Sequence, residues 1–86
     1  QNTVQLRPTS LRAFPNPFTD QLNLDIEMPW KECRVVTSDG KIIEVLKQNG
    51  QTERVTFDAS DWPQGINFLH VQYTSGQEET LRLLKQ

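Results

Sequence analysis

The sequence has little of what enzymes, metal proteins and disulfide-bonded domains require. Its 86 residues include one cysteine, Cys33, and one histidine, His70. A single cysteine cannot form an internal disulfide, so packing must hold the fold together. The chain shows no nucleophile–base pair, no set of metal ligands and no phosphate-binding loop. We therefore expect no enzymatic activity, no metal and no cofactor.

Charge and hydropathy exclude further classes. Nine basic and eleven acidic residues give a net charge of −2, without the basic face that nucleic acids require. No apolar run reaches the roughly 18 residues of a transmembrane helix, and no charged start precedes an apolar stretch as in a signal peptide. We expect a single small domain that binds neither nucleic acid nor a small-molecule substrate. If the chain is one end of a longer protein, the signal peptide lies elsewhere in that protein.

What the sequence does contain is a series of short strand-like segments separated by turn residues. Apolar and polar residues alternate most clearly over 22–28, the period of a strand with one buried face. The expected strands are 11–14, 22–28, 33–37, 42–47, 54–58, 66–73 and 79–85. Their spacing of about ten residues predicts an all-β fold, a seven-stranded antiparallel immunoglobulin-like β-sandwich. Residues 1–10 are expected to be a linker, and 11–86 a single sandwich domain.

Glycine and proline mark the expected turns. Asp39-Gly40 lies between two strand-like segments and predicts a tight hairpin in which both residues adopt positive φ. Gly65 is expected to allow a sharp turn into the sixth strand. Pro15 and Pro17 have no amide hydrogen to donate, so their segment cannot be a central strand. They are expected to hold the incoming chain against the sandwich.

The aromatic residues leave one alternative open. Trp30, Trp62 and Tyr73 could form a platform on which sugars stack, as in carbohydrate-binding sandwiches. Packing in the core or at a corner is the preferred interpretation. The alternative function is therefore a fibronectin-like accessory module of a secreted enzyme that binds carbohydrate or protein. A spacer with no partner is a second alternative.

Three features occur together in a particular order. They are Phe-Pro-Asn-Pro-Phe at 14–18, Val-Val-Thr-Ser-Asp-Gly-Lys-Ile-Ile at 35–43, and Trp-Pro-Gln-Gly-Ile-Asn-Phe at 62–68 followed by a last strand ending Leu-Leu-Lys-Gln. In this order and spacing they resemble the type A C-terminal sorting domain of the type IX (Por) secretion system of Bacteroidota, over 11–86. Asn67 departs from the family, which usually has tyrosine there. Trp62 and Phe68 are expected to compensate for the missing ring.

The resemblance implies a function in secretion. Such a domain directs a larger cargo protein through the outer membrane, and a surface sortase normally removes it and attaches the cargo to the cell surface. The implied partners are the outer-membrane translocon and shuttle proteins, the sortase and the protein's own N-terminal cargo domain. The implied location is the periplasm in transit, then the cell surface or the medium.

The resemblance also suggests which residues act. In the family the C-terminal residues carry the export signal, and a terminal strand can pair at a sheet edge or detach and be captured by a partner. We therefore expect the translocon to recognise Leu81, Leu83, Leu84, Lys85 and Gln86. The family-motif framework that supports them is expected to be Pro15, Asn16, Pro17, Asp39, Gly40 and Gly65.

Overall fold

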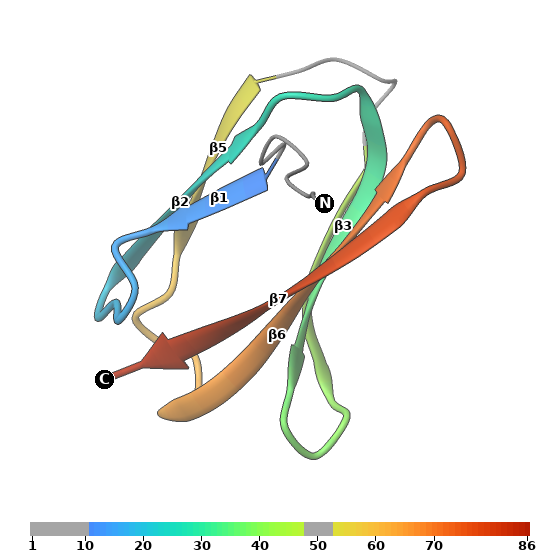
Figure 1. Ribbon diagram of the computed structural model, residues 1–86. Helices are drawn as coiled ribbons and strands as arrows, with labels where there is room; N and C mark the ends of the chain where they lie inside the picture. The colour runs from blue at the N-terminus through green and yellow to red at the C-terminus, as the bar shows by residue number, and fades with distance from the viewer. Residues whose placement is uncertain (1–10, 48–52) are drawn as a thin grey trace, which may run out of the picture.

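The computed structural model describes residues 11–47 and 53–86, and these form strands joined by turns (Figure 1). The strands are β1 (Leu11–Phe14), β2 (Gln21–Ile26), β3 (Trp30–Thr37), β4 (Ile42–Lys47), β5 (Glu53–Asp58), β6 (Gly65–Tyr73) and β7 (Glu78–Lys85). Within these two ranges no helix is long and apolar enough to cross a membrane. The expected linker, residues 1–10, lies outside the described residues.

The strands form two antiparallel sheets that face each other (Figure 1). The three-stranded sheet has the order β1-β2-β5, and the four-stranded sheet has the order β4-β3-β6-β7. Every pairing within the two sheets is antiparallel. The predicted seven-stranded immunoglobulin-like sandwich is therefore confirmed.

The core consists of alternate residues from the inner faces of both sheets. On β2, Leu22 and Leu24 are completely buried, and on β6 so is Leu69. Cys33 lies among these residues, and burial raises the pKa of its thiol to about 12. Because the thiolate is the reactive form of cysteine, Cys33 is an inert packing residue.

Trp30 is where the strand prediction was wrong. The expected strands 22–28 and 33–37 left Trp30 in the connection between them, but Trp30 begins β3 and is completely buried. It pairs with Tyr73 across an irregularity in the β3–β6 register. Pro29 is a local signal for the end of a strand, but the chain makes only a short connection there before β3 starts.

The aromatic residues do not form a sugar-binding platform. Trp30, Trp62 and Tyr73 are 0%, 7% and 1% exposed. A stacking platform needs rings whose faces are open to solvent, and these rings pack in the interior. The preferred interpretation as core and corner residues is confirmed.

The β3–β4 hairpin turns at Asp39-Gly40, as predicted, but only one of the two residues has positive φ. Gly40 has a φ of 96°, whereas no residue other than glycine has a positive φ among the described residues. The Thr37 hydroxyl donates to the Asp39 carboxylate and accepts from the Lys41 amide at 3.0 Å. The first of these bonds lowers the pKa of Asp39. Side-chain bonding by Thr37 thus stabilises the turn with Asp39 at negative φ.

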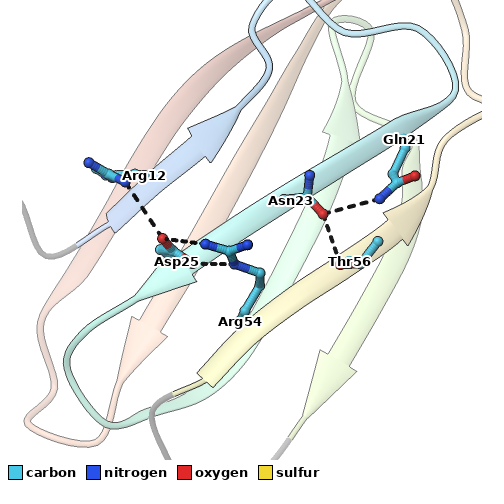
Figure 2. Close-up of polar contacts among 6 residues, drawn as sticks. All are labelled: Arg12, Gln21, Asn23, Asp25, Arg54 and Thr56. Atoms are coloured by element: carbon cyan, nitrogen blue, oxygen red, sulfur yellow. Dashed lines mark hydrogen bonds and ion pairs between the residues drawn. The ribbon is translucent and has the colours of Figure 1, made fainter.

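The outer face of the three-stranded sheet carries a charge cluster centred on Asp25 (Figure 2). Arg54 on β5 donates to both Asp25 oxygens, at 2.8 and 3.3 Å, and Arg12 on β1 lies 3.6 Å away. Both guanidinium groups also lie over the Phe14 ring, at 5.9 Å for Arg12 and 5.0 Å for Arg54. The hydrogen bond from Arg54 is the main reason that the pKa of Asp25 falls below its ordinary value.

We expect Asp25→Asn to destabilise the domain at neutral pH and to have less effect in acid. The ordinary pKa of the carboxyl is 3.8, and the folded value is lower. The stabilisation that the ionised Asp25 carboxylate gives to the folded domain is therefore complete above the ordinary pKa. It is lost as the pH falls through the pKa in the folded state. Urea unfolding of both proteins at about pH 7 and about pH 2 measures this difference. A gap between the two midpoints that stays constant with pH would contradict the assignment.

Candidate functional site

The segments that carry the family motifs all lie at one end of the sandwich (Figure 1). We call it the β7 end, because β7 stops there with Lys85 opposite Gly65, the first residue of β6. The β3–β4 hairpin turns at the same end, since Thr37 pairs with Asn67. The connection from β1 to β2 also lies there. Segments far apart in the sequence therefore share one surface.

The last residues of β7 point in alternate directions. Leu83 and Lys85 are buried, and Leu81 packs partly against the core. Leu84 is 38% exposed and Gln86 is also exposed. With the sandwich folded, only Leu84 and Gln86 of the five proposed recognition residues present their side chains to a partner.

Lys85 links the two sheets at this end. Its ammonium group donates to the carbonyl oxygen of Thr19, in the connection between β1 and β2. Its charge also contributes to the lowered pKa of Asp58, although the main cause there is the hydrogen bond from the Ser60 hydroxyl. Although it is charged, Lys85 is buried, and its ammonium group donates inside the β7 end rather than extending into solvent.

The Pro15–Pro17 motif covers the outer edge of β7. Both prolines follow cis peptide bonds. Between them, the Asn16 side chain donates to the carbonyl of Arg82 at 3.4 Å and accepts from the amide of Leu84 at 3.1 Å. These are the backbone groups that an added strand would bond. The side-chain amide of Asn16 therefore takes the place of a peptide group of a neighbouring strand.

Phe18 continues this pairing with its own backbone. Its amide donates to the carbonyl of Leu84 at 3.0 Å, and its carbonyl accepts from the amide of Gln86 at 2.8 Å. The result is a short parallel bridge between Phe18 and Lys85. The edge of β7 from Arg82 to Gln86 is thus paired, so capture of this edge by a partner strand would require Asn16 and Phe18 to be displaced.

We expect Asn16→Ala to expose this edge without unfolding the domain. The Leu84 amide loses its acceptor, and a solvent-accessible hydrogen bond contributes about 1 kcal/mol, so its hydrogen exchange should accelerate roughly fivefold. Asn16→Asp is the matched control, because it keeps the acceptor for Leu84 and loses only the donor to Arg82. Exchange at Leu84 that is unchanged in Asn16→Ala would show that Asn16 does not hold the edge.

Gly65 and Asn67 form the start of β6 at this end. Gly65 has a φ of 101°, which confirms its role in the sharp turn into the strand. Asn67 is 1% exposed and donates to the Pro63 carbonyl at 3.2 Å, while its Oδ1 has no partner among the described residues. Phe68 does not compensate for the missing ring, because it points to the opposite face of the strand.

Trp62 anchors the corner before β6. Its ring meets Phe18 edge-on at 5.7 Å and Phe57 at 5.6 Å, and its Nε1 donates to Glu44 at 3.4 Å. Phe18 therefore connects the first motif to the corner as well as to β7. Phe18 was not among the site residues predicted from the sequence, although its place at the end of the Phe-Pro-Asn-Pro-Phe motif is a signal that could have identified it.

The site has no features of a catalytic or metal centre. Within residues 11–47 and 53–86, no three histidine, cysteine or acidic side chains come together to hold a metal ion. His70 lies on the outer face of β6, where its Nδ1 is 2.9 Å from the Thr80 hydroxyl. The β7 end can therefore bind another molecule through its surface. The groups that it presents are backbone groups at strand edges, apolar side chains and single charged side chains.

Comparison with known proteins identifies the family. The family model for the secretion system C-terminal sorting domain matches residues 12–86. No curated protein matches the chain. The match covers nearly the whole chain and confirms the resemblance expected from the three motifs. It does not support the accessory binding module, and the family is one of sorting signals rather than enzymes.

Membership of this family defines the route that the domain follows. Such a domain is attached to an N-terminal cargo and interacts with the secretion machinery. It takes the cargo through the periplasm to the cell surface or the extracellular space. The chain belongs to the family of secretion system C-terminal sorting domains, and it is a C-terminal sorting signal for type IX secretion.

Proposed function

We propose that the outer-membrane translocon recognises the folded sandwich at its β7 end. Leu84 and Gln86 contact the receptor, while Leu81, Leu83 and Lys85 hold the strand in position. The observation that carries this proposal is the convergence of all three motif segments on one end, where Asn16 pairs with β7. The other framework residues position that end.

The direction of the chain supports this proposal. β1 begins at Leu11 opposite Ile26, at the end of the sandwich away from the β7 end, and runs toward the β7 end. A cargo joined ahead of β1 therefore enters the domain at the far end. We expect this entry point to leave the β7 end open to the translocon and shuttle proteins.

We also propose that residues 1–10 are the linker in which the surface sortase cuts. The segment is polar, and Pro8-Thr9-Ser10 disfavours regular structure. Sortases bind extended chain, so a cut ahead of Leu11 would release the cargo and leave the sandwich intact. Mass spectrometry of the C-terminus of the mature cargo locates the cut, and a cut within β1 or after it would contradict this assignment.

Two charge-matched double variants of the full-length cargo test recognition at the β7 end. Leu84→Asp with Gln86→Asp changes the exposed residues of that end. Ser75→Asp with Gln77→Asp changes an exposed turn at the opposite end of β7. We expect the first pair to leave the cargo in the periplasm and the second pair to allow normal export. Deletion of residues 80–86 provides the reference for complete loss of export.

Equal export of the two double variants would overturn recognition at the β7 end. Thermal unfolding of the isolated chain with each pair is the control for folding. All four positions are exposed, and substitutions at exposed positions typically change stability by about 0.5 kcal/mol or less.

A further inference from the structure

A partner can approach the end of β7 from three directions, and two of them are closed in the folded domain. The inward face carries Leu83 and Lys85, both buried. The strand edge is paired to Asn16 and Phe18. Only the outer face of the four-stranded sheet is open, and β7 presents Arg82 and Leu84 there. Apart from Gln86 at the tip of the strand, a receptor that reads the end of β7 in the folded domain therefore contacts this face.

At the β7 end the outer face is apolar on β4, β3 and β6, and β7 adds Leu84 next to Arg82. We call this surface the outer apolar band, and its members are Val36, Ile42, Ile66, Phe68 and Leu84. The strand registers place them side by side, with Val36 between Ile42 and Phe68, and Ile66 opposite Leu84. Ile42 is 50% exposed and Leu84 is 38% exposed. The second and third family motifs contribute to the band, together with β7.

The next row along the same face is polar on β3, β6 and β7, and Val45 on β4 is its one apolar side chain. Arg34 stands beside Glu32 at 3.3 Å, and His70 contacts Thr80. The band is therefore bounded, and it occupies only the end of the sheet where the motif segments converge. An apolar surface with a polar border is typical of a protein interface.

The band has a groove and a cation at its β7 side. Asn16, Pro17, Ile66, Arg82 and Leu84 line an open groove of about 250 Å³. Phe68 lies opposite Arg82 in the register. Arg12, Arg34 and Arg54 each form an ion pair, whereas Arg82 forms none among the described residues. The groove thus brings three apolar side chains next to the Asn16 amide and to a guanidinium group that has no carboxylate partner in the described part of the chain.

We propose that the outer apolar band binds a protein segment of the translocon that presents a bulky apolar side chain next to a carboxylate. The apolar side chain enters the groove beside Leu84, and the carboxylate pairs with Arg82. This inference rests on the proposed function and extends it to β4, which contributes Ile42. An anionic membrane surface is a poorer match, because it attracts clusters of basic residues and Arg82 is a single cation in a chain of net charge −2.

Two pairs of variants test this inference, each with a control on the same face. Arg82→Glu is paired with Lys47→Glu, which makes the same change of charge at the far end of the sheet. Ile42→Ser is paired with Val45→Ser, because both residues lie on β4 with exposures of 50% and 48%. Val45 stands opposite Arg34, outside the band. Thermal unfolding of each 86-residue variant checks that the fold is kept.

Binding of each variant to purified translocon in detergent gives the main measurement, and export of the full-length cargo gives the second. We expect Arg82→Glu to raise the Kd about tenfold or more and to reduce the salt dependence of binding. Ile42→Ser should raise the Kd several-fold, by roughly the effect of about 1 kcal/mol of lost apolar contact. The two controls should bind like the unchanged chain.

Three results would overturn the inference. Equal effects of a variant and its control would show that the band is not the contact. Equivalent binding to anionic lipid vesicles, with the same sensitivity to Arg82→Glu, would assign the surface to lipid. Self-association lost in Ile42→Ser, measured by sedimentation, would assign it to a second copy. If Arg82→Glu and Ile42→Ser act like their controls while the Leu84 and Gln86 double variant still blocks export, the proposed function stands and the contact does not extend to Arg82 or β4.

Discussion

Leu83→Ala should destabilise the domain severely, whereas Leu84→Ala, one residue later, should have little effect on stability. Leu83 is completely buried between the sheets, while Leu84 is 38% exposed on the outer face. Replacing a buried leucine with alanine costs about 2–5 kcal/mol, because apolar contacts are lost and a cavity remains. The free energy of unfolding of a small domain is roughly 5–15 kcal/mol in total, so this loss is a large fraction of its stability.

Thermal unfolding of the two variants measures this difference. In a small domain each kcal/mol lowers the Tm by about 4–8 °C, so Leu83→Ala should lower it by roughly 8–40 °C. Leu84→Ala should change the Tm by no more than a few degrees, because exposed substitutions have small effects. Similar losses in both variants would mean that β7 does not pack with Leu83 inward, and the division between structural and recognition residues in β7 would be wrong.

Trp62→Ala should have an effect as large as that of Leu83→Ala. The indole fills the corner before β6 and contacts the rings of Phe18 and Phe57. Loss of a buried tryptophan costs about 3–5 kcal/mol. Since Phe18 also pairs with β7, we expect the loss of Trp62 to loosen the β7 end in particular.

Trp62→Phe keeps one aromatic ring in the corner. It loses the 3.4 Å bond to Glu44 and the volume of the pyrrole ring, so about 1–3 kcal/mol should be lost, less than in Trp62→Ala. Urea unfolding of the three proteins gives the free energies, and hydrogen exchange at Gln86 reports on the β7 end. If Trp62→Phe were as unstable as Trp62→Ala, the ring contacts that phenylalanine keeps with Phe18 and Phe57 would contribute little to stability.

The strand pattern was predictable because each sheet has one buried face. Alternation along 22–26 directly reflects the burial of Leu22, Leu24 and Ile26. Trp30 was not predictable by the same reasoning, because Pro29 is a local signal for a break while the burial of Trp30 depends on its partner Tyr73. Periodicity identifies faces, but the exact start of a strand depends on tertiary pairing.

The composition of the site was harder to predict than the fold. The motifs predicted that Pro15, Asn16 and Pro17 matter, and the structure adds the contact of Asn16 with residues 66 and 68 positions later in the chain. No local pattern reveals a contact at that separation. The outward direction of Leu84 could be read from the strand period, whereas the internal partner of Lys85, the Thr19 carbonyl, depends on how the β1–β2 connection packs.

The pairing of Phe18 with Lys85 links the synthesis of the cargo to its secretion. A polypeptide that ends before Leu83 lacks a core leucine and the strand that Asn16 and Phe18 bind, so the sandwich cannot close. The sorting domain can fold only after the ribosome has translated the codons for Leu83 and the residues after it. A prematurely terminated cargo would lack a folded sorting domain that the secretion machinery can recognise. A sorting domain at the C-terminus therefore selects for complete translation products.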